Sequence, residues 1–331
     1  MAQESSSEEA GFRQVDPTPQ SGSGQSLQVA LNPAAAKVLR RTALVTVVLP
    51  FLGMLMAVSL LWQRWVYPID LAVLAVMYAL SIIGIGVGFH RLVTHRAFET
   101  YPPIKAVLCI LGSMAAEGPV LFWASIHRRH HAASDREGDP HSPHLHGATF
   151  LEAMRGAWHA HVGWMFVSNT SQLGRTIPDL LQDRVLLRIS RYYLVWAGLG
   201  ILLPGVVEAM IVPSVGGFAR GLLWGGFVRI FMVHHVSWSI NSICHLFGTR
   251  PYSNSDHSTN NILMALLSFG EGWHNNHHAF PSSALHGLRW WQIDFSGYII
   301  VLLRTVGLAW NVKVPTRTQQ NSRYANQRPT V

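Results

Sequence analysis

Long apolar runs with few or no charged residues alternate with polar stretches along the chain, and this pattern predicts four membrane-spanning helices. The first two runs, residues 43–62 and 71–89, contain no charged side chain and have about the 20 residues that cross a bilayer. The other two, residues 192–212 and 218–239, are separated by a short run of turn-forming residues at 213–217. We therefore expect an all-α membrane protein.

The polar segments between these runs predict which side of the membrane each one occupies. Basic residues at 37–41 precede the first run, and cytoplasmic segments carry an excess of Lys and Arg. A further apolar stretch, residues 104–126, contains Lys105 and is broken by Glu117-Gly118-Pro119, which leaves an uncharged piece too short to span. We expect this stretch to lie at the interface. Both chain ends and a helical cap are then cytoplasmic.

The composition changes at both ends of the apolar part. Residues 1–36 are polar and rich in Ser, Gln, Glu and Pro, which is typical of a disordered tail. The membrane domain is expected to occupy residues 37–312, and residues 313–331 are expected to form a C-terminal tail.

Composition and charge favour a membrane protein and argue against a nucleic-acid-binding, disulfide-rich or iron–sulfur protein. Only 13% of the residues are charged, about half the share in a soluble domain. The net charge of +8 does not indicate nucleic acid, because the basic residues are not gathered with aromatic residues on one face. The two cysteines form no CxxC pair, so neither a disulfide framework nor an iron–sulfur site is expected.

Histidines form three clusters next to the predicted spans. The pattern H-x-x-H-H occurs twice, at residues 127–131 and 274–278, and a looser H-x4-H joins His90 and His95. Positions i, i+3 and i+4 lie on one face of a helix, so each H-x-x-H-H run presents its imidazoles together. His90 and His95 are about 140° apart on an ideal α-helix, so they converge only if the helix ends or bends between them.

These clusters predict a metal site. Neutral imidazole is the commonest side-chain ligand, and Asn241 and His245, one turn apart, are a further candidate pair. Eight or nine converging histidines exceed the four ligands of a zinc site, so two ions are expected. Imidazole with few carboxylates suits iron, copper, zinc or nickel. The remaining histidines are expected to be loop or surface residues: His144, His146, His159, His257 and His286.

Longer motifs carry a family resemblance. They are G-F-H-R-L-V-T-H-R, H-R-R-H-H followed by D-P-H, H-V-G-W, N-S-I-C-H and G-E-G-W-H-N-N-H-H-A-F-P. In them the chain resembles the membrane-bound fatty acid desaturases, especially the Δ9 acyl-CoA group. The resemblance implies two iron ions, with Asn241 reaching a metal through a water. The implied ligands are His90, His95, His127, His130, His131, His245, His274, His277 and His278.

Three further side chains are expected to contact the ligands rather than the metals. The resemblance of D-P-H implies this role for His141. Asp139 and Glu271 are candidates because carboxylates commonly orient ligand imidazoles, with loop solvation as the alternative.

The resemblance implies an enzyme that uses O2 and two electrons to remove two hydrogens from neighbouring carbons of an acyl chain. An unactivated methylene has no acidic proton, so a bound metal must supply the oxidising chemistry. An apolar tunnel would hold the chain, and Tyr78 either limits its length or packs between helices. The chain contains no haem CxxCH and no ferredoxin cysteine set. A separate reductase and a ferredoxin- or cytochrome b5-type carrier are therefore implied.

The resemblance favours acyl-CoA as substrate and a cis Δ9 double bond in the product. Animal members of the family hold CoA with basic pairs at two places, where this chain has Ser125-Ile126 and Ser168-Asn169. Arg128, Arg129 and Arg175 are candidate replacements, since phosphates are bound by Arg and Lys. An acyl chain on a glycerolipid is the alternative substrate. A related di-iron hydroxylase and a membrane metal transporter are the alternative functions.

Overall fold

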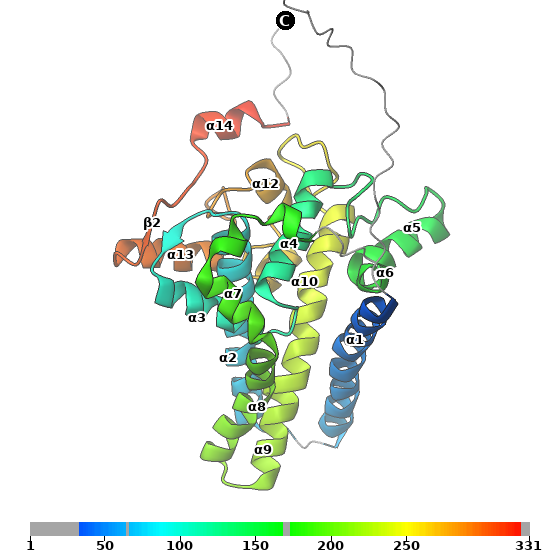
Figure 1. Ribbon diagram of the computed structural model, residues 1–331, viewed down its shortest axis with the longest axis vertical. Coiled ribbons are helices and arrows are strands. Elements are labelled where there is room, and N and C mark those ends of the chain that lie inside the picture. Colours follow the sequence, from blue (N-terminus) through cyan, green and yellow to red (C-terminus); the bar gives the residue numbers. More distant parts are fainter. Residues whose placement is uncertain (1–32, 64–65, 168–172, 326–331) are drawn as a thin grey trace, which may run out of the picture.

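A computed structural model describes residues 33–63, 66–167 and 173–325 of the chain, and it is mostly helical. Long helices stand side by side in the lower half of Figure 1, and shorter helices form a cap at their upper end. The long helices are α1 (Pro33–Trp62), α2 (Pro68–Ile83) continued by the π-helix η1 (Gly84–Thr94), α8 (Tyr193–Ile211), and α9 (Val215–Gly221) continued by the π-helix η5 (Leu222–Val228) and α10 (Arg229–Leu246).

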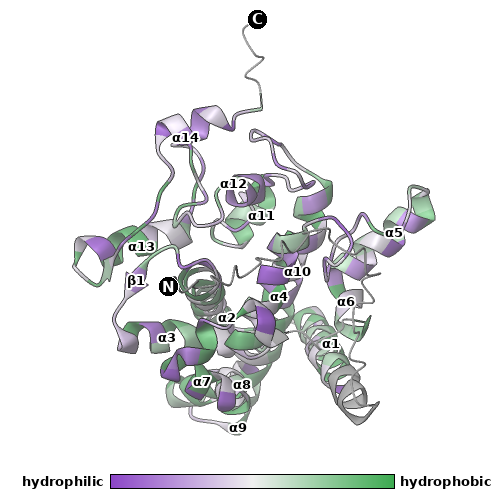
Figure 2. Cartoon of the chain, turned by 45° about the horizontal axis from the view of Figure 1, so that its top comes forward, coloured by the Kyte–Doolittle hydropathy of each residue, from purple (hydrophilic) through white to green (hydrophobic). Residues whose placement is uncertain are grey.

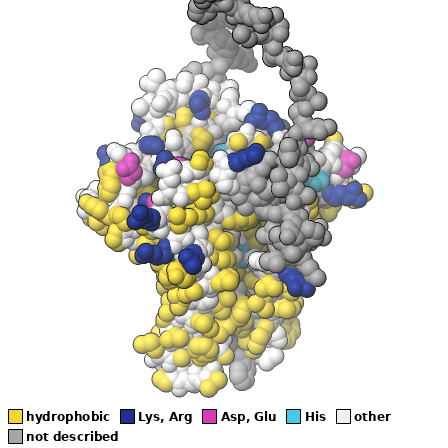
Figure 3. Space-filling model, viewed as in Figure 1, with side chains coloured by type: hydrophobic (Ala, Val, Ile, Leu, Met, Phe, Trp, Pro, Cys, Tyr) yellow, Lys and Arg dark blue, Asp and Glu magenta, His cyan; other side chains and the backbone are white. Residues whose placement is uncertain are grey.

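Three helices in the described part of the chain are long and apolar enough to cross a membrane. They are Arg41–Trp62, Pro68–Thr94 and Tyr193–Ile211. Their outer faces are apolar, and Figure 3 shows a lower half that is almost entirely hydrophobic, with Lys and Arg gathered above it. The expected membrane association follows from these helices.

The fourth predicted span lies within the continuous helix 215–246 and is not among these three. It is less apolar because it carries charged and imidazole side chains. One of them, Arg229, is fully buried and donates hydrogen bonds to the carbonyl oxygens of Gly225, Met114 and Gly200. The helix therefore packs inside the bundle and satisfies its guanidinium with backbone oxygens.

The apolar stretch at 104–126 forms two short helices, α3 (Pro102–Ser113) and α4 (Val120–Ala133). Ala116 and Gly118 separate them with positive φ angles of 63° and 100°, a conformation that ends a helix. Neither helix is long enough to be a candidate span. This agrees with the expectation that the stretch does not cross.

The cap consists of short elements around α4 and the end of α10. A two-residue strand β1 (Glu99–Thr100) pairs antiparallel with β2 (Ala309–Trp310). The helices are α5 (Phe150–Trp158), η2 (His159–Gly163), α6 (Trp164–Val167), η3 (Leu173–Thr176), η4 (Leu180–Gln182), α7 (Arg184–Arg191), α11 (Ile262–Leu267), α12 (His274–Ala279), α13 (Phe295–Thr305) and α14 (Arg317–Ser322).

Both predicted tails need correction where the structure describes them. Helix α1 begins at Pro33, so the last four residues of the expected tail 1–36 are helical. Residues 1–32 and 326–331 lie outside the described part. Residues 313–325 are docked on the cap: the carbonyl of Lys313 accepts from the N–H of Ala284 at 2.8 Å, and the N–H of Ala325 donates to the carbonyl of Pro251 at 2.9 Å. These backbone hydrogen bonds hold the segment, which contains α14, against the cap.

Candidate metal centre

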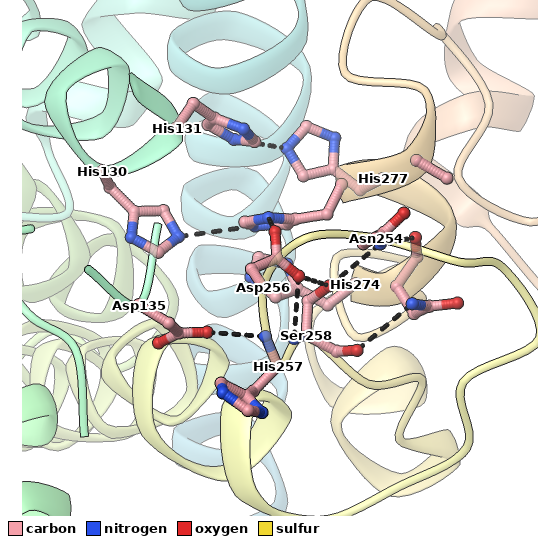
Figure 4. Close-up of polar contacts among 12 residues, drawn as sticks. His130, His131, Asp135, Asn254, Asp256, His257, Ser258, His274 and His277 are labelled. Carbon is pink, nitrogen blue, oxygen red and sulfur yellow. Dashed lines mark hydrogen bonds and ion pairs between the residues drawn. The ribbon is translucent and has the colours of Figure 1, made fainter. Parts of the chain in front are cut away.

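All nine histidines predicted as ligands converge in the cap, and they form two groups. Within each group one ligand nitrogen per ring lies within 4.8 Å of those of the others. Figure 4 shows imidazoles of α4 and α12 facing one another. The first group is His90, His95, His127, His131 and His277, and the second is His130, His245, His274 and His278.

The two H-x-x-H-H runs each contribute to both groups. In α4, His127 and His131 belong to the first group and His130 to the second. In α12 the division is reversed: His274 and His278 belong to the second group and His277 to the first. An i, i+4 pair therefore serves one group, and the intervening i+3 residue reaches the other.

The first cluster converges because its helix widens. His90 belongs to the last turns of η1, a π-helix in which N–H groups bond to carbonyls five residues earlier, and His95 directly follows that helix as its C-cap. The N–H of His95 donates to the carbonyl of His90 at 3.0 Å. Their rings lie 4.8 Å apart. The helix therefore brings His90 and His95 together by a wider, π-helical turn, which ends at Thr94.

Buried carboxylates fix the orientation of four ligand rings through Nδ1. Glu271 accepts from His90 and Asp139 accepts from His130 at 2.9 Å, as the sequence suggested. Asp135 accepts from His245 at 2.8 Å, and Asp256 accepts from His278 at 2.6 Å. A carboxylate at Nδ1 places the proton there and leaves the Nε2 lone pair facing the group.

Asp135 and Asp256 were missed by the sequence analysis. Asp135 follows His131 by four residues, a spacing that a search for nearby carboxylates would have found. Asp256 lies in the loop between α10 and α11, 22 residues before its partner His278, and no local pattern signals the contact. It also accepts from the hydroxyl and N–H of Ser258, which fixes the carboxylate.

Burial and crowding favour the neutral form of five imidazoles of the site. Burial lowers the pKa of His127, His131, His274, His277 and His278 well below the usual value, and neighbouring imidazoles lower it further. A neutral ring retains the lone pair that binds a metal. The site is thus prepared for cations at neutral pH.

Two further histidines border the groups. His141 is buried, its ring lies 4.4 Å from that of His130, and burial lowers its pKa to about 3. His286 lies in a loop, one of the two expected places, but it is buried, and its ring lies 4.5 Å from that of His277. Its loop folds inward because the Asp294 carboxylate accepts from the N–H of His286 at 2.7 Å.

A buried ion cluster joins η1 to the loops around α12. The fully buried guanidinium of Arg91 donates to Glu271 at 3.0 Å and to Asp294 at 2.9 Å. Removing one partner of a buried ion pair costs about 3–5 kcal/mol. Arg91 therefore fixes Glu271 and, through it, the ring of His90.

The remaining predicted loop histidines contact the cap backbone or one another. His144 is half-buried, with Nε2 2.8 Å from the carbonyl oxygen of His245, and its ring centroid lies 4.3 Å from that of His257, with the two rings tilted. His159 lies against the carbonyl of Pro140, and its ring is 4.7 Å from that of His146. None of these four belongs to a three-residue metal-binding group in the described part of the chain.

The nine rings fit a pair of metal ions. Five imidazole nitrogens converge in one group and four in the other. In four of these rings Nδ1 is bonded to a carboxylate that lies outside both groups. Imidazole donors of this number suit transition metals. Bound there, two ions would be held by histidines from η1, α4, α10 and α12.

An apolar cavity of about 530 Å³ reaches these groups. Its walls come from α1, α2, α4, α6 and α10, and among its residues are His90, His127 and His274. Asn241, the predicted water-mediated ligand, also lines it. Of the residues described in its wall, Thr42 and Val167 are the exposed ones, which places its mouth between α1 and the end of α6.

Tyr78 does not belong to this wall, and the tunnel role suggested for it is corrected. Its hydroxyl donates to the carbonyl of Leu267 at 2.7 Å, and its ring packs edge-on against Phe269 at 6.3 Å. The side chain is thus held between α2 and the cap. Ile82, one turn further along α2, does line the cavity.

One acidic residue faces the cavity away from the metal groups. Glu117 accepts from Trp123 Nε1 and from the Ser237 hydroxyl, both at 3.0 Å and both through Oε2. Its Oε1 is buried without a partner among the described residues. Burial raises the pKa of this carboxyl to about 7.

The candidate spans indicate a membrane-associated protein. The two histidine groups could bind metal ions, and the apolar cavity that reaches them could hold an apolar ligand beside those ions. A model of the family described as fatty acid desaturase matches residues 69–296. The chain belongs to the fatty acid desaturase family, whose members are oxidoreductases of lipid metabolism.

Relatives in this family differ in the carrier of the acyl chain. The chain is 46% identical over 271 residues to a hex-5-enoyl-[acyl-carrier protein] acetylenase of Moorena producens, covering 81% of this chain and 84% of that protein. It is 39% identical to an sn-1 stearoyl-lipid 9-desaturase of Anabaena variabilis, covering 72% and 81%. It is 37% identical to an icosanoyl-CoA 5-desaturase of Limnanthes douglasii, covering 73% and 64%. The similarity extends to Δ9-type members.

Proposed function

We propose that this protein is an O2-dependent di-iron desaturase that introduces a cis double bond into a long saturated acyl chain. The observation that carries the proposal is the position of both histidine groups at the end of one apolar cavity. The family supports iron as the metal. Iron bound there supplies the oxidising chemistry that an unactivated methylene requires.

The chain's own residues orient the centre and the substrate. Glu271, Asp139, Asp135 and Asp256 hold ligand rings by their Nδ1 atoms, so the Nε2 atoms are set before any metal arrives. Partners of this kind are worth about 10–100-fold in metal affinity or activity. The apolar wall excludes water and restricts where a chain can lie, which places one pair of carbons near the histidines.

For the carrier we propose a glycerolipid, in place of the acyl-CoA that the motifs favoured. No Lys or Arg is among the described residues of the cavity wall. Arg128, a candidate for binding CoA, already donates to both carboxylate oxygens of Asp179. Ser125 is buried and bonded to Thr176 at 2.7 Å. Ser168-Asn169 lies outside the described residues.

The mouth between α1 and α6 supports the same choice. Next to it, the face of α1 that carries Val45 and Val48 is exposed and apolar, as a lipid-facing surface would be. An acyl chain could pass from the bilayer into the cavity without crossing water. The Δ9 position is proposed from the similarity to stearoyl-lipid 9-desaturases.

The proposed topology has four spans, with residues 215–246 providing the fourth. It places the cap, both histidine groups and both chain ends on the cytoplasmic side. The domain proposal begins the membrane domain at Pro33, where α1 starts, continues it to residue 312 and adds the docked segment 313–325. Two external electrons would come from a separate one-electron carrier.

Expression in a host that lacks its own desaturase tests the proposal. The host lipids should gain monounsaturated chains, and gas chromatography with mass spectrometry should place the double bond at Δ9. Purified enzyme with iron, a reductant and O2 should desaturate stearoyl chains in phospholipid and leave stearoyl-CoA unchanged. A variant with His131→Ala is the inactive control.

Each alternative has its own signature in this experiment. Hydroxylated chains without new double bonds would identify a hydroxylase. Turnover of stearoyl-CoA alone would overturn the lipid carrier. Metal uptake without any change in lipids would favour a transporter, although the histidine groups lie at the cap end of the helices, whereas transport sites lie near the membrane midplane.

A further inference from the structure

The docked C-terminal segment and the loop after α12 together build one surface of the cap. We name it the C-terminal face, residues 279–293 and 313–325. These segments contain Arg289, Lys313, Arg317 and Arg323 and no acidic residue. The face lies on the side of the cap away from the long helices, where Figure 1 and Figure 2 show α14 beyond α12. A soluble protein can reach it there.

Two of the basic side chains of this face, Arg289 and Arg323, lie over aromatic rings. The guanidinium of Arg289 lies 5.2 Å from the ring of Tyr324, and that of Arg323 lies 5.3 Å from the ring of Phe280. Arg323 also donates to the carbonyl of Ala279, the last residue of α12. All four basic side chains are exposed. Exposed cations on a preformed surface favour an acidic partner, because complementary charge speeds and orients docking.

The carboxylates at the border of the face do not cancel this charge. Asp294 is buried and bonded to Arg91. Glu99 accepts from Trp310 Nε1 and from the Asn311 side chain, both uncharged, so it keeps one negative charge against the four basic side chains of the face. The face therefore presents a net positive surface.

Tryptophans connect this face with the second histidine group. Trp290 is 94% exposed and its neighbour Trp291 is 49% exposed. The ring of Trp291 lies edge-on to that of the buried Trp273, with centroids 5.4 Å apart. Trp273 directly precedes His274, and its Nε1 donates to the carbonyl of Ile293 at 2.8 Å, which fixes the ring. A short series of rings thus leads from solvent to the second group.

From these observations we infer that the C-terminal face is the docking surface for an acidic one-electron carrier, and that Trp291 and Trp273 lie on the electron path to the histidine groups. The inference rests on the proposed function, because desaturation with O2 consumes two electrons and two protons and yields two waters. Each reduced carrier that docks is oxidised by one electron, so two dockings serve one double bond.

Charge reversal on this face tests the docking surface. The holoenzyme in neutral-lipid vesicles is assayed with reduced plant-type ferredoxin, with reduced cytochrome b5, and after reduction by dithionite without O2, removal of the excess and addition of O2, a route that needs no docking. The double variant Arg289→Glu with Arg317→Glu should raise KM for the productive carrier about tenfold, since electrostatic steering is worth 10–10³ in association rate. The matched control is Arg155→Glu on α5, on the other side of the cap, where KM should stay unchanged.

A direct binding measurement provides a readout other than activity. Immobilised carrier should bind metal-free wild type more tightly than the double variant, and added salt should reduce the difference. Trp291→Leu should lower kcat with the carrier while KM and the dithionite rate stay unchanged, and Trp291→Phe should restore part of the rate. Thermal unfolding of each variant shows that the fold is retained.

Several outcomes would overturn the inference while leaving the proposed function intact. One is an unchanged KM and binding for both carriers in the double variant. Another is a defect that appears only in vesicles with anionic lipid, which would assign the face to the membrane. Turnover with dithionite but with neither carrier would also overturn it. If wild type with dithionite forms no double bond, the proposed function itself has failed.

Discussion

The N–H of His95 donates a hydrogen bond to the carbonyl of His90, five residues earlier, at 3.0 Å. This π-type bond places side chains five positions apart on one side of the helix end. In an α-helix the pair would diverge by about 140°. The local widening therefore lets H-x4-H act with the two H-x-x-H-H runs as one group.

Loss of a ligand from either group should remove metal and activity together. His131→Ala deletes a ring from the first group and His278→Ala one from the second. We expect each variant to lose iron, measured by inductively coupled plasma mass spectrometry, and to make no unsaturated product. His146→Ala, whose ring lies near His159 outside both groups, should retain both properties. Full activity in either ligand variant would remove that histidine from the site.

Replacing Asp256 should weaken the centre without removing a ligand. In Asp256→Asn the charge opposite His278 Nδ1 is lost while the shape is kept. Iron affinity, measured by competition with a chelator, should fall about 10–100-fold. The control Asp183→Asn removes the charge that pairs with Lys105 at 2.7 Å, away from the histidine groups, and should leave iron affinity unchanged. Equal iron affinities in Asp256→Asn and wild type would show that the carboxylate does not support the metal.

Glu117 should make substrate binding depend on pH. Burial raises the pKa of its carboxyl to about 7, so the group is neutral below this pH and becomes charged above it. A charge in the apolar cavity opposes binding of an acyl chain. KM for the acyl substrate should therefore be lowest near pH 6 and should rise above pH 7. Glu117→Gln cannot ionise and should give a flat KM; the same rise in that variant would exclude Glu117 as its cause.

Ile82 and Tyr78 should differ in their effect on chain length. Ile82 lines the cavity eight residues before His90, about 12 Å along a helix. Ile82→Trp should fill that part of the cavity and shift the product profile toward shorter chains. Tyr78→Ala should leave the profile unchanged, because Tyr78 packs outside the wall. Longer products from Tyr78→Ala would show that Tyr78 does limit the length of the acyl chain.

Cysteine labelling should show the cap on one side of the membrane and the α8–α9 turn on the other. Arg155→Cys and Arg317→Cys introduce thiols at exposed cap positions, and Val215→Cys introduces one at an exposed position at the far end. The native Cys109 and Cys244 are buried and should not react. An impermeant reagent added outside intact cells should modify only the Val215→Cys protein. Labelling of all three variants from one side would contradict the four-span topology.

The converging histidines could be predicted from the sequence because their spacing is a local property. Helical geometry alone brings His127 and His131, or His274 and His278, to one side of a turn. The candidate spans could also be predicted from local information, because an apolar run of about 20 residues is typical of a helix that crosses a membrane. Asp139 could be proposed because it lies close in sequence to its partner His130.

Tertiary packing decided the contacts between distant segments, and local patterns carry no information about them. Asp256 meets His278 only because the loop between α10 and α11 folds over α12. His286 is buried rather than exposed because its loop bonds to Asp294, which Arg91 of η1 holds in the interior. Residues 313–325 resemble a polar tail, yet backbone hydrogen bonds dock them on the cap.

The sequence by itself determined the family, the helical class and the nine histidines that converge in the cap, since each depends on residue identity and short-range spacing. The tertiary structure alone decided how these histidines divide between two groups, which carboxylates orient them and which side chains line the cavity. The physical reason is that hydrogen bonds, ion pairs and cavity walls form between side chains that are close in space. Their separation along the chain, such as the 180 residues between Arg91 and Glu271, is set by packing of the whole fold.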